Sequence, residues 1–350
     1  MKESCDSKNS EAEIMRFITC ASYYGSGSSA ITDLVSEYDT VYSFTDEEFR
    51  FLQDPDGIAN LEWNLVHHFD RHTSGHALKR YKRLVDLYCG NIFGKKYETF
   101  FHGNWKKYSY QYINDLTDFT YNGWWNWDMY DRGDLYYFRK RIFNKILKMT
   151  IWRKQPERTL NTMKDEITYC SHPSEEKFLF LTKNYIEQLF SSVCNRAQTI
   201  MVDQIVPPTN LQYYLRYFDD IKVAVVDRDP RDIFVLEKYV WRDGIIPTDV
   251  ETFCKWFEYT RNHRKCDDLN TNNIHYVQFE DLIYHYDETS KKIAKWLDLD
   301  EEHHTMSRKY FDPDKSIDNT QTWKKYPCDM KEIEYIGSEL RNYLYNFKRL

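Results

Sequence analysis

Residues 14–38 read IMRFITCASYYGSGSSAITDLVSEY, and this stretch decides the fold class. Its first part, 14–21, is an apolar run with β-branched and aromatic residues, which predicts a buried strand. The run leads into a turn that contains Gly25 and Gly27, and apolar residues then recur at helical spacing. A strand, a glycine turn and a helix in this order are the opening of an α/β unit.

Three later runs have the same character as the first. Residues 199–206, 221–227 and 274–279 are rich in Val and Ile, and helical patterns follow the second and third of them. Near-continuous apolar strands that alternate with helices are typical of a parallel sheet covered on both faces. We therefore expect an α/β fold, with a parallel sheet flanked by helices.

Composition narrows the class of protein. The chain has 350 residues, a net charge of −7 and 17% aromatic residues, so it can bury a full core. The negative charge argues against a non-specific nucleic-acid binder, which needs a basic face. No apolar stretch approaches the roughly 20 residues that span a bilayer, and residues 1–10 are too polar for a secretory signal. We expect a soluble, cytoplasmic protein without a membrane span.

The cysteines do not indicate a metal or a disulfide framework. There are 8 of them, without a CxxC pair, and the two nearest neighbours, Cys254 and Cys266, are 12 positions apart. This spacing fits neither a zinc site nor a small disulfide-rich fold, so we expect reduced thiols that serve packing.

The composition of the chain changes between 61 and 172. Residues 97–152 hold 18 aromatic side chains in 56 positions, and helical patterns dominate. We expect a single domain over 1–350, with a flexible tail at 1–13, a mostly helical insertion at 61–172 between the first two strands of the sheet, and a C-terminal loop and helix at 301–350.

The turn at 24–29 is a candidate anion site. Its two glycines let the backbone approach a ligand, and the helix N-terminus adds N–H groups to the hydroxyls of Ser26, Ser28 and Ser29. A Walker A loop would have a lysine before the serine, and this turn has none. The alternative interpretation is an ordinary Gly/Ser helix cap.

Arg228 is a second candidate for anion binding. It follows the strand at 221–227, so it is expected at the carboxyl edge of the sheet, where open α/β folds bind ligands. Its planar guanidinium suits a phosphate. The alternative is that Arg228 and Arg231 pair with the neighbouring Asp229 and Asp232 in a turn.

Together, the two motifs resemble the family of sulfotransferases that use 3′-phosphoadenosine 5′-phosphosulfate (PAPS), of the carbohydrate type, whose fold is similar to that of P-loop NTPases. In that family the first loop holds the 5′-phosphosulfate and the later arginine holds the 3′-phosphate. The resemblance implies that Arg228 binds the 3′-phosphate. It also implies that the phosphosulfate is bound by Gly25, Ser26, Gly27, Ser28 and Ser29.

Later segments extend the resemblance, which covers roughly 14–45 and 199–327. Residues 276–282 and 291–299 look like the strand with Glu-Asp-Leu and the helix that follow in the family. The loop at 319–325 looks like the one that closes over the nucleotide, and this implies cofactor contacts from Trp323, Lys324 and Lys325.

Two positions depart from the family pattern. Gly25 stands where many relatives have Lys or Arg, and Leu236 stands where many have Ser. We expect other cations, Lys324 or Lys325, to serve the groups that these residues contact in relatives.

The resemblance implies in-line transfer of a sulfuryl group to an acceptor, with a base that removes the acceptor proton. Asp203 is our first candidate for the base because it lies in an apolar run, where a carboxylate is costly unless it is paired or used. It could instead cap a helix. Gln204 is a candidate for holding the acceptor, and His72 is the second candidate for the base.

The histidines at 67, 68, 72 and 76 could share helix faces, but spacing marks no third metal ligand, so we expect no metal. Trp124, Trp125 and Trp127 could stack on the C–H faces of a sugar, although most aromatics of the insertion are as well explained by core packing.

The sequence thus predicts a PAPS-dependent sulfotransferase that acts on a hydroxyl of a small-molecule or glycan acceptor, most simply a carbohydrate. The alternatives are a P-loop-type kinase that uses ATP, and a non-catalytic nucleotide- or glycan-binding protein of the same fold. The expected partner is the acceptor, not a nucleic acid, and no pattern indicates an oligomeric state.

Overall fold

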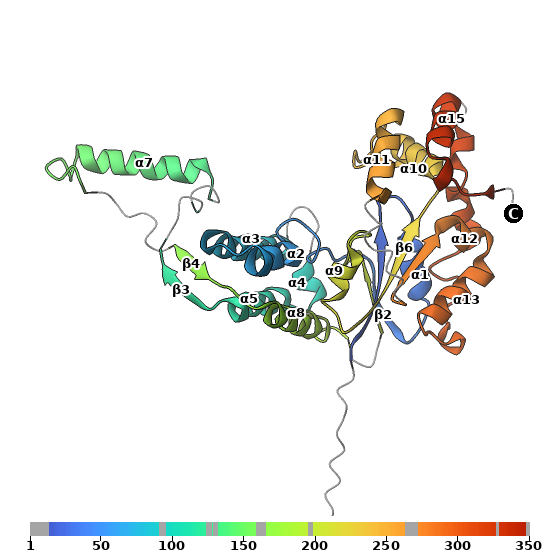
Figure 1. The fold of residues 1–350 in the computed structure, drawn as a ribbon, viewed down its shortest axis with the longest axis horizontal. Coiled ribbons are helices and arrows are strands. Elements are labelled where there is room, and N and C mark those ends of the chain that lie inside the picture. Colours follow the sequence, from blue (N-terminus) through green and yellow to red (C-terminus); the bar gives the residue numbers. More distant parts are fainter. Residues whose placement is uncertain are drawn as a thin grey trace, which may run out of the picture. The chain divides into compact units, whose positions relative to one another are not determined.

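This computed structural model describes residues 14–90, 96–123, 128, 132–158, 166–194, 199–262, 272–326 and 329–347. The chain forms two compact units (Figure 1). The first unit comprises the chain up to Gln53 and from Cys194 onward, and the second comprises Asp54–Val193.

The first unit contains a parallel five-stranded sheet in the order β2-β5-β1-β6-β7. Its strands are β1 (Arg16–Ser22), β2 (Val41–Glu48), β5 (Thr199–Asp203), β6 (Asp220–Asp227) and β7 (Ile274–Gln278). β1 is central and pairs along its whole length with β6, from Arg16 opposite Asp220 to Ser22 opposite Val226. Because β5 and β6 pair with opposite sides of β1, the crevice for a ligand is expected where these strands end.

Among the described residues of the first unit, helices follow each of these strands except β2. They are α1 (Ser29–Val35), α9 (Leu211–Leu215), α10 (Pro230–Leu236), the π-helical turn η2 (Glu237–Trp241), α11 (Val250–Asn262), α12 (Phe279–Tyr284), α13 (Tyr286–Trp296), α14 (Pro313–Ser316) and α15 (Met330–Glu339), with short 3₁₀ turns η4 (Glu301–His303), η5 (Ile317–Asn319), η6 (Thr322–Lys325) and η8 (Arg341–Tyr343).

Alternate residues of β1 face opposite sides of the sheet. Ile18 and Cys20 belong to one buried cluster with apolar residues of α1, α12 and α13, which lie together in Figure 1. Phe17 points the other way and packs edge-on against Phe218, with ring centroids 5.1 Å apart. The expected α/β fold with a parallel sheet flanked by helices is confirmed.

The placement of the insertion needs a correction. β2 was not among the expected strands, because its second half, Thr-Asp-Glu-Glu, hides the apolar pattern of its first half. β2 precedes the insertion, so the insertion lies between the second and third strands of the sheet rather than between the first and second.

The second unit is mainly helical. Its helices are α2 (Ile58–Glu62), the π-helical turn η1 (Trp63–His67), α3 (Arg71–Cys89), α4 (Tyr97–Phe100), α5 (Trp105–Leu116), α7 (Asp134–Met149) and α8 (Glu175–Phe190). It also holds an antiparallel pair, β3 (Phe119–Asn122) and β4 (Ile167–Cys170). This pair was not expected, because strands of four residues are too short to show an alternating pattern.

Aromatic residues form the core of the second unit. Tyr97, Phe101 and Trp105 are fully buried, and the indole N–H of Trp105 donates a 2.9 Å hydrogen bond to the carbonyl of Val85. Large aromatics are stable in a core when their polar tips find a partner. In the described part of the chain, no helix has the length and apolar character needed to cross a bilayer.

Candidate functional site

The loop between β1 and α1 needs its glycines. Gly25 and Gly27 have φ angles of +65° and +90°, a region that side chains disfavour. A Cβ at Gly27 would lie 2.4 Å from the ring of Phe279, and one at Gly25 would lie 2.5 Å from the ring of Trp241. The loop backbone is therefore held between two aromatic rings.

The end of this loop presents polar groups to a ligand. The first helical hydrogen bonds of α1 are donated by Ala30 and Ile31, at 3.1 and 3.0 Å, so the amides before them have no acceptor within the helix. Ser28 and Ser29 line a cavity beside these amides. Ser26 is different because it is buried and its Oγ accepts a 3.4 Å bond from the N–H of Tyr23, which braces the turn.

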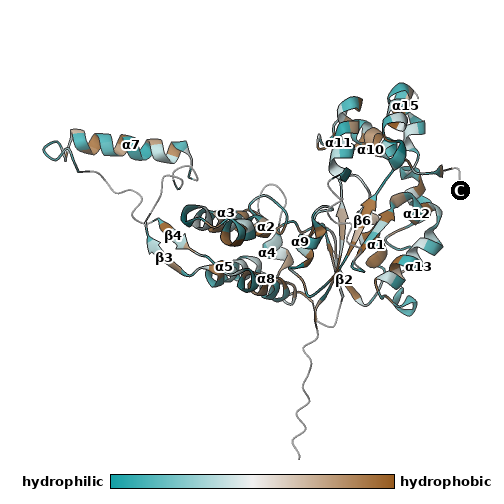
Figure 2. Ribbon diagram, viewed as in Figure 1, coloured by the Kyte–Doolittle hydropathy of each residue, from teal (hydrophilic) through white to brown (hydrophobic). Residues whose placement is uncertain are grey.

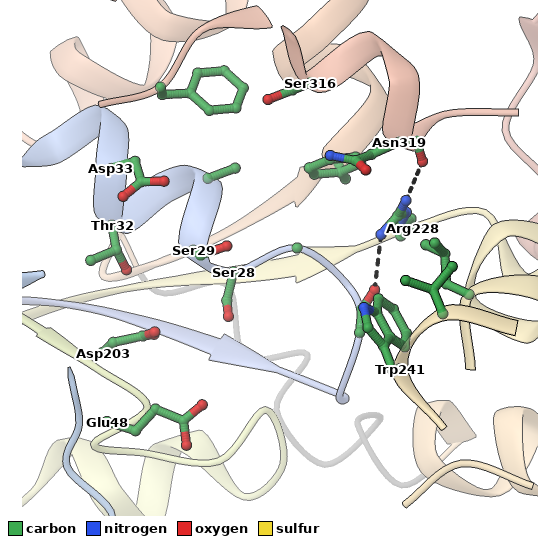
Figure 3. A pocket seen from close by; sticks show the side chains of 17 residues that line it. Ser28, Ser29, Thr32, Asp33, Glu48, Asp203, Arg228, Trp241, Ser316 and Asn319 are labelled. Carbon is green, nitrogen blue, oxygen red and sulfur yellow. Dashed lines mark hydrogen bonds between the residues drawn. The ribbon is translucent and has the colours of Figure 1, made fainter. Parts of the chain in front are cut away.

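The cavity has a volume of about 550 Å³, and the described residues that line it belong to the first unit. In Figure 3, Arg228 and Trp241 lie on one side of Ser28, and Asp203 and Glu48 lie on the other. This agrees with the sheet order, because Arg228 follows β6 whereas Asp203 ends β5.

Arg228 is a buried cation whose hydrogen bonds go to the backbone. Its side chain is 4% exposed and donates to the carbonyl oxygens of Gly25, at 3.4 Å, and Asn319. Its Nε has no partner among the described residues, and its guanidinium lies 4.6 Å from the centre of the Phe279 ring. Burial lowers the pKa of Arg228, whereas the nearby charges of Asp232, Glu280 and Asp229 favour its charged form.

Arg231 behaves in the opposite way. Its Nε and Nη2 donate to the two carboxylate oxygens of Asp229, at 2.9 and 2.6 Å. The alternative in which arginine and aspartate pair within the turn is therefore right for Arg231. The side chain of Arg228 instead donates its hydrogen bonds to carbonyl oxygens, although the charges of Asp232 and Asp229 act on it.

Two buried carboxylates accept hydrogen bonds from the segments that surround Arg228. Glu280 accepts a 2.8 Å bond from the N–H of Asp229, and burial raises the pKa of Glu280 to about 7. Asp232 accepts bonds from the N–H of Gln321, at 2.8 Å, and the hydroxyl of Thr322, at 2.6 Å. The loop that carries Asn319 is thereby tied to the start of α10.

The structure places the expected cofactor contacts of this late loop as follows. Trp323 is partly buried against α10, α11 and α15, and the guanidinium of Arg231 lies 4.6 Å from its ring centre. The amine of Lys324 bonds to the side chain of Gln321, and that of Lys325 donates to the carbonyl of Asp318 at 3.1 Å. These residues are outside the described lining of the cavity, so their cofactor contacts stay a prediction.

Asp203 has the properties of a base. It is 9% exposed, lines the cavity, and its Oδ1 has no hydrogen-bond partner among the described residues. Burial, followed by the charge of Glu48, raises the pKa of Asp203 to about 7. A carboxyl group with this pKa exchanges its proton near neutral pH. Glu48 stands opposite Asp203 in the pairing of β2 with β5.

Gln204 holds the loop rather than pointing away from it. Its φ is +56°, and its amide nitrogen donates to the hydroxyls of Ser22, at 2.6 Å, and Ser28, at 3.1 Å. The side chain of Gln53 donates to the carbonyl of Gln204 at 2.5 Å. Gln204 therefore orients Ser28, and its expected contact with an acceptor stays a prediction.

The remaining predicted residues lie in the second unit. The backbone N–H of His72 donates to Asp70 at the start of α3, and its role as a base stays a prediction. Trp124, Trp125 and Trp127 lie outside the described residues. His67 Nε2 lies 3.1 Å from the buried Glu62. Together with Glu175, these two residues form a group whose potential metal-ligating atoms lie within 4.8 Å of one another.

Sequence reasoning missed Glu48, Trp241 and Asn319, all of which line the cavity. Glu48 could have been found through the Val-Tyr-Ser-Phe start of β2, which is a strand signal. Trp241 carries no such signal, because it ends a π-helical turn, whose extra residue changes the face that the side chain takes. Asn319 contributes a carbonyl oxygen, which any residue has.

No protein-family model and no curated protein matches the chain. Several solved structures are similar to it, and three of them are described by their identity and coverage. The sulfotransferase domain of the olefin synthase from Synechococcus PCC 7002 is 14% identical, with 92% of this chain and 94% of that chain covered and a TM-score of 0.40. Sulfotransferase STF1 from Mycobacterium tuberculosis H37Rv is 10% identical, with 88% and 77% covered and a TM-score of 0.34.

Sulfotransferase STF9 from Mycobacterium avium is 11% identical, with 95% of this chain and 77% of that chain covered and a TM-score of 0.38. All three are sulfotransferases, the family that the sequence motifs resemble. At identities of 10% to 14%, these similarities concern the fold alone.

Proposed function

We propose that this chain is a PAPS-dependent sulfotransferase that transfers a sulfuryl group to an acceptor hydroxyl. The observation that carries the proposal is Arg228, a buried cation that bonds to carbonyl oxygens, leaves its Nε unpaired and lines the cavity beside a glycine loop. The charges of Asp232, Glu280 and Asp229 favour the charged form of Arg228, and its unpaired Nε is a donor that a bound anion would satisfy.

The cavity has groups for each part of the donor. The loop amides and the hydroxyls of Ser28 and Ser29 suit the 5′-phosphosulfate, because a glycine loop at a helix start favours tetrahedral anions. The guanidinium of Arg228 suits the 3′-phosphate. Leu236, Val240 and Trp241 add an apolar wall for the adenine.

The bound donor would supply an electrophilic sulfur, which forms a bond to the acceptor oxygen as its bond to the phosphate oxygen breaks. The protein supplies the proton acceptor. Asp203, ionised above a pKa of about 7, takes the hydroxyl proton onto its carboxylate. Gln204 keeps the hydroxyl of Ser28 in place through its 3.1 Å hydrogen bond, so the loop need not reorganise during transfer.

The acceptor would approach from the side of Asp203 and Glu48. Both carboxyl groups line the cavity on that side, and hydroxyl groups pair readily with carboxylates. A small-molecule or glycan hydroxyl, most simply that of a carbohydrate, is our proposed acceptor. A panel of sugars and simple alcohols, tested with labelled PAPS, would identify the class.

A P-loop kinase is the main rival for the same loop. A kinase loop uses a lysine to reach the β- and γ-phosphates, whereas Ser28 and Ser29 are preceded by Gly27. In addition, Arg228 suits a phosphate at a position where ATP has a hydroxyl. The cavity therefore favours a 3′-phosphorylated nucleotide.

Isothermal titration calorimetry distinguishes the two. We expect 3′,5′-adenosine bisphosphate to bind more tightly than ADP, or than ATP with magnesium. A preference for ATP with magnesium would contradict the proposal. Tight binding of the bisphosphate without turnover of PAPS on any acceptor of the panel would favour a non-catalytic binding protein.

A further inference from the structure

Helix α7 (Asp134–Met149) carries an apolar stripe that is open to solvent. The stripe follows a spacing of three, four, four and three residues, which keeps its members on one side of a helix. It consists of Leu135, Phe138, Ile142, Ile146 and Met149, which are between 44% and 72% exposed. Figure 2 shows apolar segments alternating with polar ones along this helix, in which no side chain is buried.

The rest of this helix is strongly basic. Residues 134–149 contain five Lys or Arg side chains and one acidic side chain, Asp134. Over 132–154 the count rises to eight basic residues against one acidic residue, a net charge of +7 in a chain whose total is −7. Positive charge is therefore concentrated here against the overall sign of the protein.

The basic residues are arranged around the apolar stripe. At 3.6 residues per turn, Arg139 falls on one flank of the stripe and Lys145 on the other. Lys140 and Arg141 lie over the rings of Tyr136 and Tyr137, at 5.2 and 5.8 Å from the ring centres. Long basic side chains of this kind reach sideways from a buried stem and keep their charge in a polar layer.

We propose that α7 binds an anionic lipid bilayer, lying in the interface with its apolar stripe among the acyl chains and its basic flanks on the headgroups. A helix with bulky apolar residues on one face and Lys or Arg on the other is suited to this position. Charge complementarity selects anionic lipid, because the flanks on both sides of the stripe carry cations and a planar anionic surface meets both flanks at once.

An acidic protein groove is a different partner for such a helix. A groove would cover the stripe, but it would have to offer carboxylates on both walls at the spacing of Arg139 and Lys145. A lipid surface needs no fixed spacing of anionic groups, because its headgroups can rearrange around the basic side chains. The observations therefore favour the bilayer, and a protein groove is an outcome of the test.

The test is co-sedimentation of the full chain with phosphatidylcholine vesicles, with and without a quarter of phosphatidylserine. We expect binding to the anionic vesicles, weaker binding in higher salt, and little binding to pure phosphatidylcholine. Replacing Arg139 and Lys145 by Gln should weaken binding about fivefold for each charge removed.

Phe138→Asp provides the sharpest variant because the chain offers a matched control. Phe138 is 60% exposed on α7, and Phe180 is 63% exposed on α8, so Phe180→Asp makes the same chemical change at the same exposure. We expect Phe138→Asp to abolish vesicle binding and Phe180→Asp to leave it unchanged. Far-UV circular dichroism and bisphosphate binding should be the same for both variants, which excludes misfolding.

Three results would overturn the proposal. The first is absence of binding to anionic vesicles in low salt. The second is equal loss of binding in Phe138→Asp and Phe180→Asp. The third is a stoichiometric complex of α7 with an acidic protein that Phe138→Asp prevents, together with absence of binding to the vesicles.

Discussion

The two units differ in where they place their buried polar groups. At the carboxyl edge of the sheet the first unit buries charges, which include Asp203, Arg228, Asp229, Asp232 and Glu280. The second unit also buries the carboxyl groups of Glu62 and Asp128, but its aromatic core pairs neutral hydroxyls, as in the 2.7 Å contacts between Ser109 and Tyr185 and between Tyr112 and Thr182.

The difference separates function from packing. A neutral hydroxyl pair costs little to bury, whereas an ionised group costs several kcal/mol of stability unless it is compensated. The first unit bears that cost where its strands end and the cavity lies. The aromatic surplus of the second unit is, by contrast, mostly what holds its helices together.

The largest expected effect comes from Asp203, the proposed base. Asp203→Asn should lower turnover about 10²- to 10⁴-fold and leave bisphosphate affinity unchanged, because the amide cannot accept the proton. Wild-type turnover should rise with pH through about 7, as the Asp203 carboxyl with its raised pKa loses its proton. Steady-state kinetics across pH measure both effects.

Glu48→Gln is the control for this effect. The charge of Glu48 raises the pKa of Asp203, so its removal should move the midpoint of the pH profile downward and leave the maximal rate largely intact. Full turnover in both Asp203→Asn and Asp203→Ala would show that another group is the base.

The next largest expected effect is a loss of stability in the aromatic core of the second unit. Trp105→Ala should lower the free energy of unfolding by about 3 to 5 kcal/mol, because removal of a fully buried indole leaves a cavity in the core. Trp63, which is 55% exposed in the same unit, provides the matched control. Chemical denaturation of Trp63→Ala should differ from wild type by about 0.5 kcal/mol at most, and equal losses would contradict a structural core around Trp105.

A third effect measures the cost of the buried charge itself. The pKa of Asp203 is about 7 in the folded chain and about 3.9 when unfolded, so folding is most favoured when this carboxyl is protonated. Its contribution to stability is present below about pH 4 and is lost as pH rises through 7. Wild type should therefore lose about 2 to 4 kcal/mol of stability between pH 4 and pH 8 that Asp203→Asn does not lose.

Asp314→Asn is the control here, because the Asp314 side chain is 82% exposed and pairs with Arg308 at the surface. Its unfolding free energy should follow that of wild type across the same pH range. If Asp203→Asn also follows wild type, Asp203 is not a buried carboxylate with a raised pKa.

Much of the first unit could be predicted because its signals are local. The apolar run before Gly25 identifies β1 and the glycine loop after it, and the strand that ends at Asp227 places Arg228 at the sheet edge. Asp203 was found because a carboxylate interrupts an apolar strand. In each case a few consecutive residues carry both the element and the chemistry.

The rest depends on contacts between distant segments. Trp241 reaches the cavity through a π-helical turn, and Asn319 reaches Arg228 because Asp232 holds the following residues. Ser26 was expected to face a ligand, but it is buried and braces the turn. No local pattern distinguishes its hydroxyl from that of Ser28.

One thermodynamic cycle tests directly whether Arg228 binds a 3′-phosphate. Calorimetry would compare 3′,5′-adenosine bisphosphate with 5′-AMP, which lacks the 3′-phosphate, in wild type and in Arg228→Ala. We expect Arg228→Ala to weaken binding of the bisphosphate about 10- to 150-fold, the loss expected for charged hydrogen bonds, and to leave binding of 5′-AMP unchanged. Equal weakening of both nucleotides, or of neither, would contradict this expectation.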